Sequence, residues 1–518
     1  GTILAGGNYQ GSGSEQRATE TNVAAGASLK ADAVNSGNGG TVVVWADKTT
    51  TFGGIISAKG GSQSGDGGKV ETSGKQKLTV ANTAKVDTTA AKGKTGSWLL
   101  DPEDFIIGTG ATGDNYWNNT DVQKALDSSD IFIKTEQTQN TAGTLNSNTT
   151  WLTSDGTGNG DINILAPLTW SKNKLTLSAY RNINIKSTLS ATGTSSLEMT
   201  SGSGGTIDYG LTASGFTGKV NFSERTAGSG ITANNGFLTI NGNAYTVITS
   251  LGAEGSTDTD LQGMNGNLSG HYFLGADINA SSTSTWNSNA GFAPIGTQSN
   301  TFTGTFDGGG HSISGLTINR PTESYVGLFG YTNGATLANV GLIAGSVTGA
   351  STVGGLVGSQ AGGSISNSYA TGNVTATAGT PGNGYVGGLI GRASGNASIT
   401  DSYATGTVSG PYSVGGLVGD TLDNITITRS YATGNVVGGT GNSDSYFGGL
   451  VGQLRENCTV TGSYATGSVS GYQYTGGLIG WNEGTVNSSY AVGNVSGTYS
   501  VGGLAGAQYG TGSISNSY

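Results

Sequence analysis

Short runs of apolar residues alternate with polar residues and glycines along the whole chain. In the segments DINILAPLTW (161–170) and KLTLSAYRNINIKSTLSA (174–191) the alternation has a period of two, which predicts half-buried β-strands. Segments 39–61 and 67–108 contain further short apolar runs between glycine-rich turns. The pattern therefore predicts many short strands joined by tight turns.

Residues 119–129 (NTDVQKALDSS) are the exception to this pattern. Val122 and Leu126 lie one helical turn apart, and Asn119 or Thr120 precedes them as a candidate N-cap. The segment predicts a single short helix that interrupts the β structure.

The strongest regularity lies in the last part of the chain, where two phrases return in step. One phrase is built around Gly-Gly-Leu, as in VGGLVG, and the other around Ser-Tyr-Ala-Thr-Gly. The leucines of the first phrase, spaced 28, 33, 28, 33, 28 and 26 residues apart, are Leu328, Leu356, Leu389, Leu417, Leu450, Leu478 and Leu504. The tyrosines of the second phrase, spaced 34, 28, 33, 26 and 28 residues apart, are Tyr369, Tyr403, Tyr431, Tyr464, Tyr490 and Tyr518. This spacing predicts a solenoid in which each repeat builds one coil and length differences form loops.

The coils are expected to be β-structure. Each repeat contains several glycines, which would cost a helix about 1 kcal/mol apiece, and its apolar runs are rich in β-branched and aromatic residues. The sequence therefore predicts an all-β fold, a right-handed parallel β-helix in which equivalent side chains of successive coils form ladders. The fold can include small extra-helical β modules. The glycines are assigned to corners that need a positive φ or a close approach of neighbouring coils.

Three regions follow from these patterns. Residues 1–108 are expected to form a β-helical shaft, and residues 109–300 an irregular β-helix with the short helix and inserted modules. Residues 301–518 are expected to form a repeat-built β-helix.

The second phrase allows a specific structural prediction at two of its positions. In ISNSY, strict alternation would put Asn367 between Ile365 and Tyr369 on one face, but this middle position is variable and mostly polar in the other copies. We therefore expect a bend or bulge there. The serine before each tyrosine never changes among the copies and is expected to satisfy a buried backbone group. These serines are Ser368, Ser402, Ser430, Ser463, Ser489 and Ser517.

Composition and charge exclude some classes of binding partner. Glycine accounts for 95 of 518 residues and the net charge is −10. Lysine is absent after Lys219, so no clustered positive charge is available to displace counterions from nucleic acid or to bind an anionic membrane surface. We expect neither DNA nor RNA as a partner, and no apolar run is long enough for direct membrane insertion.

The residues that carry metal or redox chemistry are scarce. Cys458 is the single cysteine, so no intrachain disulfide can form, and His271 and His311 are the only histidines. Segment 60–68 (GGSQSGDGG) faintly resembles a calcium-binding nonapeptide, but such motifs act in tandem and this one stands alone. No metal site and no cofactor are expected.

Carboxylates are the remaining candidates for chemistry, since parallel β-helices can host carbohydrate-cleaving enzymes that use them. The candidates are Asp101, Glu103, Asp104, Asp155, Asp161 and the pair Asp307 and His311. We interpret all of them as turn residues in preference to a catalytic site.

Tyrosines are candidates for contact with a ligand. The tyrosines of the second phrase could bind sugars through their ring faces, but we favour a role as buried aromatic area in the core. A less regular set precedes the Gly-Gly-Leu phrases and is the better candidate for an exposed contact surface. This set is Tyr385, Tyr412, Tyr446, Tyr472, Tyr474 and Tyr499.

The phrases GGLVG and GGLIG followed by SYATG resemble the GLUG repeat of bacterial surface proteins. Segments 39–76 and 94–108 resemble the β-helical shaft of two-partner-secretion exoproteins, adhesins of the filamentous-haemagglutinin and high-molecular-weight adhesin kind, and segments 175–185 and 302–330 resemble later parts of the same proteins. The resemblance implies a protein secreted through an outer-membrane two-partner-secretion transporter and folded outside the cell as a surface rod.

The expected function is therefore that of a fragment of a secreted bacterial adhesin, without enzymatic activity. Such a rod would attach to host cells, other bacteria or biofilm matrix through a receptor that could be a glycan. Two alternatives stay open: a β-helix polysaccharide lyase or hydrolase, and an inert stalk for a toxin or adhesin beyond the C-terminal end.

Overall fold

The computed structural model describes residues 1–111, 113–136, 158–223, 235–379, 383–439 and 444–518. The chain forms two compact units, Gly1–Tyr245 and Thr246–Tyr518. Within each unit, short strands stack in parallel on the equivalent strands of the neighbouring coil. The predicted all-β parallel β-helix is confirmed.

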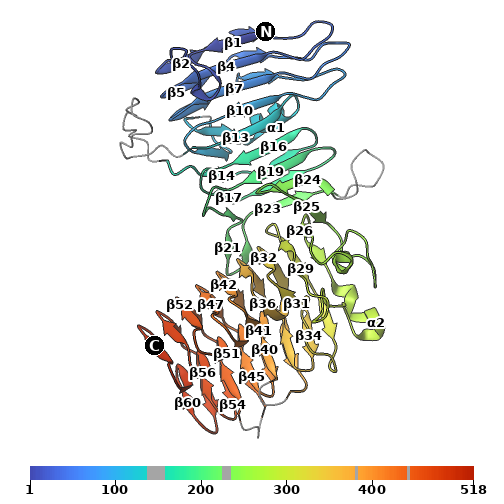
Figure 1. The fold of residues 1–518 in the computed structure, drawn as a ribbon, viewed down its shortest axis with the longest axis vertical. Coiled ribbons are helices and arrows are strands. Elements are labelled where there is room, and N and C mark those ends of the chain that lie inside the picture. The colour runs from blue at the N-terminus through green and yellow to red at the C-terminus, as the bar shows by residue number, and fades with distance from the viewer. Residues whose placement is uncertain (112, 137–157, 224–234, 380–382, 440–443) are drawn as a thin grey trace. The chain divides into compact units, whose positions relative to one another are not determined.

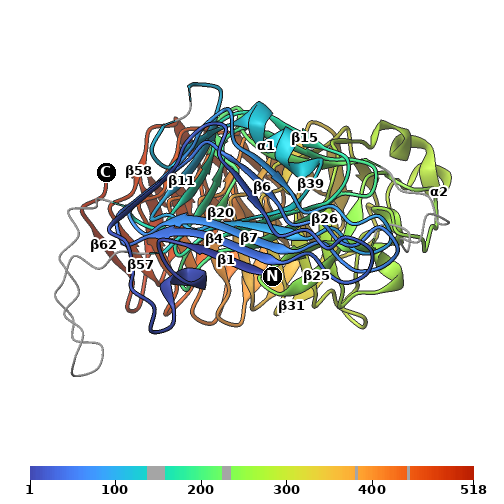
Figure 2. The same cartoon turned by 90° about the horizontal axis from the view of Figure 1, so that it is seen from above.

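The first unit is built around one long column of parallel strands, several of which are visible in Figure 1. This column contains β1 (Thr2–Ala5), β4 (Thr41–Ala46), β7 (Lys69–Gly74), β10 (Ser97–Leu100), β13 (Asp130–Lys134), β16 (Lys174–Ser178), β19 (Ser196–Thr200) and β24 (Asn235–Ile240). Figure 2 shows β1, β4 and β7 lying over one another. In register, Val42 of β4 pairs with Val70 of β7, and both side chains are buried. β4 and β7 are buried along almost their whole length, whereas β13 alternates between buried and half-buried side chains.

Shorter columns complete the coils of the first unit. Two of them serve the first coils: β2 (Glu20–Val23), β5 (Thr49–Phe52) and β8 (Lys77–Val80), and β3 (Ser28–Lys30), β6 (Ile55–Ser57) and β9 (Lys85–Asp87). The later coils use β12 (Tyr116–Asn118), β11 (Phe105–Gly108), β14 (Ile162–Ile164), β17 (Ile183–Ile185) and β20 (Ile207–Asp208), together with β15 (Leu168–Trp170), β18 (Thr188–Ala191) and β23 (Lys219–Phe222). An antiparallel hairpin of β21 (Leu211–Thr212) and β22 (Gly215–Phe216) extends from these coils.

The predicted helix forms as α1 (Asn119–Leu126). Its N-cap is Asn118, whose side-chain oxygen accepts a hydrogen bond from the backbone N–H of Thr120. The prediction of Asn119 or Thr120 as the N-cap was therefore wrong, because the cap lies one residue before Asn119. Asn119 is instead buried in the helix, where its amide donates to the carbonyl of Pro167. Val122 and Leu126 are buried as the pattern predicted.

The second unit has five columns, numbered here as sheets 1 to 5 in the order in which the chain visits them. Sheet 1 contains β26 (His271–Leu274), β28 (Thr305–Asp307), β32 (Thr336–Ala338), β37 (Ser364–Ser366), β42 (Ser398–Thr400), β47 (Thr426–Thr428), β52 (Thr459–Thr461), β57 (Thr485–Asn487) and β62 (Ser513–Ser515). Sheet 2 contains β27 (Ile278–Asn279), β29 (Ser312–Ser314), β33 (Gly341–Ile343), β38 (Tyr369–Ala370), β43 (Tyr403–Ala404), β48 (Tyr431–Ala432), β53 (Tyr464–Ala465) and β58 (Tyr490–Ala491).

The other three sheets close each coil. Sheet 3 contains β30 (Thr317–Asn319), β34 (Ser346–Gly349), β39 (Asn373–Ala376), β44 (Val408–Gly410), β49 (Val436–Gly438), β54 (Val469–Gly471) and β59 (Val495–Gly497). Sheet 4 contains β35 (Thr352–Gly354), β40 (Tyr385–Gly387), β45 (Ser413–Gly415), β50 (Tyr446–Gly448), β55 (Thr475–Gly476) and β60 (Val501–Gly502). Sheet 5 contains β31 (Phe329–Asn333), β36 (Val357–Ala361), β41 (Ile390–Ser394), β46 (Val418–Thr421), β51 (Val451–Leu454), β56 (Ile479–Asn482) and β61 (Ala505–Gln508).

The bend expected within ISNSY is present in every copy. The middle residue has a left-handed backbone each time, with φ values from 46° to 59°. These residues are Asn367, Asp401, Arg429, Gly462, Ser488 and Asn516. A left-handed residue turns the chain between sheets 1 and 2, which explains why the position does not belong to a core-facing alternation.

The serine after this bend forms a ladder that runs through the coils. The Ser402 hydroxyl donates to the carbonyl of Thr400 at 2.9 Å and accepts the backbone N–H of Ser368 at 3.2 Å. The same two bonds recur at Ser430 and Ser463. The expected role of these serines in satisfying buried backbone groups is confirmed.

The paired glycines before each leucine allow neighbouring coils to approach closely. A Cβ atom added to Gly388 would lie 2.3 Å from the carbonyl oxygen of Gly416 in the next coil. The second glycine of the pair is therefore required by proximity of the two backbones and not by a positive φ.

The length differences between repeats are concentrated at the corner between sheets 3 and 4. In one coil this corner runs from Val374 to Val386, and in the next only from Val408 to Val414, yet the valines pair in register at both ends. An insertion at this corner leaves the ladders on either side unchanged.

Candidate functional site

The leucines of the first phrase lie inside the second unit. Leu328, Leu356, Leu389, Leu417, Leu450 and Leu478 are fully buried, and Leu504 is partly buried against the same core. The ladder of large apolar side chains that these positions form is part of the packing and offers no contact surface.

The tyrosines of the second phrase form a continuous stack. Their rings lie 4.7 to 5.4 Å apart between centroids, with interplanar angles of 3° to 10°, from Tyr369 through Tyr403, Tyr431, Tyr464 and Tyr490 to Tyr518. Each strand continues with an alanine, and the core of the unit includes Ala404 and Ala432 but none of these tyrosines. Because side chains alternate along a strand, the rings point away from the core. Tyr369 and Tyr403 are buried, as expected, but Tyr431, Tyr464 and Tyr490 are half-buried and Tyr518 is exposed, so the stack as a whole does not fill the core.

Burial raises the pKa of Tyr369, Tyr431 and Tyr464 in this stack. The pKa of Tyr431 is raised to about 12, first by burial and then by the neighbouring Tyr464. Since both faces of an inner ring are covered by its neighbours, a ligand could reach only ring edges and hydroxyls there.

The tyrosines expected to form a contact surface divide into three groups. Tyr385 is only 4% exposed, so its assignment as an exposed residue was wrong; the Arg392 guanidinium lies 5.1 Å from its ring centroid. Tyr499 is 55% exposed. The other four are half-buried: Tyr412, Tyr446, Tyr472 and Tyr474.

Two of these half-buried tyrosines belong to an aromatic cluster on sheets 4 and 5, which we call the aromatic platform: Tyr446, Tyr474, Trp481 and Tyr509. Tyr446 and Tyr474 are stacked with 5.5 Å between centroids, and both meet Trp481 edge-on, at 5.3 and 4.8 Å. Trp481 and Tyr509 are stacked at 3.9 Å. Residues next to these along the strands, such as Phe447, belong to the core, so the platform lies on the outer side of the coil.

Sequence reasoning missed Trp481 and Tyr509. Trp481 occupies a register position that is Tyr331, Ser359, Arg392, Asp420, Gln453 and Ala507 in the other coils. No single residue type recurs at this position. The sequence marks it only by its fixed distance after the Gly-Gly-Leu phrase.

An ion triad lies in the same column of sheet 5, two coils before Trp481. The buried Asp420 carboxylate is flanked by Arg455, whose Nε lies 2.8 Å from one oxygen, and by Arg392, whose Nε lies 3.2 Å from the other. Burial raises the pKa of Asp420 to about 6, against the opposing effect of the two guanidiniums. Arg455 also donates to Gln453 at 3.0 Å. The triad joins three successive coils.

The carboxylates near residue 101 hold neighbouring segments together. Glu103 accepts the backbone N–H of Gly158, and Asp104 accepts those of Asn159 and Asp161. Asp101 lies 3.2 Å from Lys134 Nζ, and burial, followed by the nearby Glu136, raises its pKa to about 7.

The other sequence-predicted carboxylates also have structural partners. Asp161 accepts Arg181 Nε at 2.9 Å, and this hydrogen bond is the main cause of its lowered pKa. Asp155 lies outside the described residues.

The structure does not assemble Asp307 and His311 into an acid–base pair. Asp307 accepts the Gly309 N–H at 2.8 Å and the Asn339 amide at 3.0 Å, while His311 Nδ1 lies 3.2 Å from Asp277. Burial raises the pKa of Asp307 to about 6.

The calcium-like segment at 60–68 is likewise part of the coil contacts. Asp66 Oδ1 accepts the backbone N–H of Lys94, which belongs to the next coil. Among the residues that the structure describes, no group of three or more His, Cys, Asp or Glu side chains is arranged to hold a metal ion.

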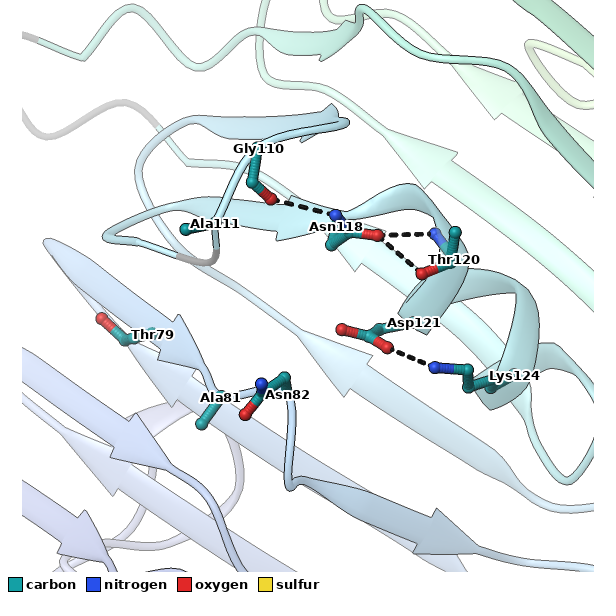
Figure 3. A pocket seen from close by; sticks show the side chains of 9 residues that line it. All are labelled: Thr79, Ala81, Asn82, Gly110, Ala111, Asn118, Thr120, Asp121 and Lys124. Atoms are coloured by element: carbon teal, nitrogen blue, oxygen red, sulfur yellow. Dashed lines mark hydrogen bonds and ion pairs between the residues drawn. The ribbon is translucent and has the colours of Figure 1, made fainter.

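A separate open hollow of about 560 Å³ lies in the first unit beside α1 (Figure 3). It is lined by Thr79, Ala81, Asn82, Gly110, Ala111, Asn118, Thr120, Asp121 and Lys124. Asp121 and Lys124 pair with each other at 2.9 Å, and Asn118 caps the helix. These polar groups thus serve the helix itself, while the Thr79 hydroxyl donates to Asp114.

Comparison with known proteins identifies the repeat. A sequence model of the family described as "The GLUG motif" matches residues 349–375 and 382–409, which confirms the predicted GLUG resemblance there. Halomucin from Haloquadratum walsbyi is 45% identical over 158 residues, a match that covers 29% of this chain and 2% of that protein's length. Within the described residues, no helix is both long and apolar enough to cross a membrane.

Two solved structures are similar over about half of the chain. An IgA1 protease superposes with a TM-score of 0.42 and 22% identity over 52% of this chain and 21% of its own. A candidate immunoglobulin A1 protease from Bacteroides ovatus superposes with a TM-score of 0.33 and 20% identity, over 53% of this chain and 75% of its own.

Proposed function

We propose that this chain is a β-helical segment of a secreted bacterial surface adhesin. It spaces and presents a contact surface that attaches to host cells, other bacteria or biofilm matrix. Passage through an outer-membrane two-partner-secretion transporter is part of the proposal, and a chain with a single cysteine suits it, since no intrachain disulfide can lock the unfolded chain before export.

The in-register stacking of the GLUG coils supports this proposal most strongly. Strands of all five sheets pair in parallel with the equivalent strands of the next coil, and serine and tyrosine side chains repeat their contacts from coil to coil. A solenoid of this kind has a large outer surface for its length, which suits spacing and contact better than enclosure of a small substrate.

The buried carboxylates do not favour the alternative of a polysaccharide-cleaving enzyme. Asp420 is held between two arginines, Asp101 lies against Lys134, and Asp307 accepts two hydrogen bonds from its own unit. We therefore propose attachment without turnover.

The proposal is tested by immobilising the purified chain on beads. The beads are incubated with epithelial cells and with biofilm matrix, and the soluble fraction is assayed for new reducing or unsaturated sugar ends. Attachment without such products is expected. Release of sugar ends would support the enzyme, and absence of attachment to every surface would support an inert stalk. Beads that carry the Leu417→Asp variant, whose coils should not pack, serve as the control for folding-dependent attachment.

A further inference from the structure

We propose that the aromatic platform of Tyr446, Tyr474, Trp481 and Tyr509 is a binding site for an uncharged oligosaccharide. The inference rests on the proposed adhesive function and gives it a ligand class and a place on the fold. It concerns the outer side of sheets 4 and 5 in the last coils of the second unit.

The platform differs from the tyrosine stack in what a ligand can reach. In the stack, each inner ring is covered on both faces by parallel neighbours at 4.7 to 5.4 Å. In the platform, Tyr446 is stacked on Tyr474 and Trp481 is stacked on Tyr509, so each ring has only one stacked neighbour. The two pairs meet where Tyr446 and Tyr474 lie at interplanar angles of 68° and 84° to Trp481. Rings set at right angles to one another leave surfaces of different orientation at one place, and Tyr509 is 46% exposed there.

The platform is local to a few coils. The sheet 5 position equivalent to Trp481 is tyrosine in the first coil and serine, arginine, aspartate and glutamine in the four coils that follow. The sheet 4 position equivalent to Tyr446 is Ser413 in the preceding coil and Tyr385 in the coil before that. The ladder rule of the repeat does not require aromatic residues here. Their concentration is therefore a property of this surface and not of coil packing.

The charges around the platform favour an uncharged ligand. Arg455, which directly follows β51 of sheet 5, is paired with Asp420 at 2.8 Å and bonded to Gln453. Glu483 and Asp444 add negative charge close to Arg455 and Tyr446, respectively. A polyanion such as single-stranded nucleic acid needs a positively charged groove beside its stacking rings, which this surface lacks.

The chemistry of the platform matches that of a pyranose. The C–H faces of a sugar ring are apolar and pack on aromatic rings, while its hydroxyls need donors and acceptors at the edge. Tyrosine and tryptophan combine a rigid apolar face with a polar group and lose little conformational entropy on binding. The phenol hydroxyls and the Gln473 amide, which accepts the Asp444 N–H at 2.9 Å, provide such groups at the rim.

The test uses the complete chain and isothermal titration calorimetry. The uncharged probes are cellohexaose, mannohexaose, xylohexaose and hexa-N-acetylchitohexaose, and hexagalacturonic acid is the charged probe. We expect at least one uncharged probe to bind and the Trp481→Ala variant to lose about tenfold in affinity or more. Trp481→Phe should retain part of the affinity, because it keeps an aromatic face.

The matched control is Tyr431→Phe. It removes the hydroxyl group from one ring of the tyrosine stack on sheet 2 and should leave the affinity for the sugar probes unchanged. Circular dichroism and the denaturation midpoint of each variant establish that it is folded. If Trp481→Ala does not fold, Tyr446→Leu and the more exposed Tyr509→Ala replace it, and each should weaken binding.

Four results would overturn the inference: binding of the charged probe alone, binding of none of the uncharged probes, equal affinity of the wild type and the platform variants, or an equal loss in Tyr431→Phe. The bead assay separates this failure from that of the proposed function. If beads attach to cells while every uncharged probe fails, adhesion stands and the platform is not its sugar site.

Discussion

At the scale of single residues, the serine ladder shows how a repeated polar side chain can be required by the fold. Each hydroxyl donates to a carbonyl of its own coil and accepts an N–H of the preceding coil, as Ser402 does with Thr400 and Ser368. Alanine at one copy would remove both bonds and leave a buried N–H and a buried carbonyl without this partner. A buried backbone group that loses its hydrogen bond costs more than the bond itself contributes on balance.

We expect Ser402→Ala to lower the free energy of unfolding of the second unit by about 1–3 kcal/mol. Urea denaturation followed by circular dichroism measures the change. Ser496→Ala, at an exposed position of β59, is the control and should change the free energy by less than about 0.5 kcal/mol. Equal effects of the two substitutions would show that the ladder contributes nothing specific.

At the scale of the element, the register of the strands repeats once per complete coil. Val357 and Ile390 occupy the same register position in successive coils, and both follow a buried leucine. Removal of one complete coil would bring equivalent strands of its two neighbours into contact. Removal of part of a coil would shift every strand that follows and would place polar side chains against the core.

Deletion of residues 357–389, which joins Leu356 to Ile390, should therefore preserve the β-sheet signal and a cooperative unfolding transition. Deletion of residues 357–370 should abolish the transition of the second unit, although it removes fewer residues. Circular dichroism and denaturation of the two shortened chains distinguish these outcomes. A shorter deletion that is tolerated as well as the complete coil would contradict the register argument.

At the scale of the whole molecule, buried carboxylates link stability to pH. The pKa is raised to about 7 for Asp101 and to about 6 for both Asp307 and Asp420, from an ordinary value of 3.8, with burial as the first cause in each case. A raised pKa means that the folded protein binds the proton more tightly than the unfolded chain. These groups therefore add stability below about pH 4 that is lost as the pH rises through 6 to 7.

Asp307→Asn tests this linkage, because the amide oxygen can still accept from Gly309 and Asn339. In the wild type, Asp307 should contribute about 1–3 kcal/mol of stability at pH 4 relative to pH 7. The difference between the pH profiles of the variant and the wild type, from urea denaturation at pH 4 to 7, isolates this contribution. If the free energies of unfolding of the variant and the wild type change with pH in parallel, Asp307 does not make this contribution.

The sequence predicted the parts of the molecule that depend on periodicity. The leucine positions, the bend at Asn367 and the bonding of Ser368 follow from comparing copies of the repeat, because equivalent residues of a solenoid have the same neighbours. The side on which the tyrosines lie could not be read in this way. The bend before Ser368 changes which of the following residues faces the core, so the alanine is inside and Tyr369 outside.

Trp481 of the aromatic platform and the ion triad were missed for a related reason. Trp481, Arg392 and Asp420 occupy a column whose residue type differs in every coil. Contacts between adjacent residues of such a column depend on which residues of neighbouring coils pair with each other. The spacing of the repeats in the sequence does not give this information. The caps of α1 and the partners of Asp307 are local details of the same kind.

The corner between sheets 3 and 4 has a further consequence for how such a chain can change. Because Val374 and Val386 stay in register with Val408 and Val414 despite the longer connection, additional sequence at this corner does not change the register of the coils around it. Every coil thus offers one site at which natural variation, or a grafted epitope, can enter without a compensating change elsewhere. A lineage that carries this scaffold could diversify what it displays coil by coil, while the columns that hold it together stay the same.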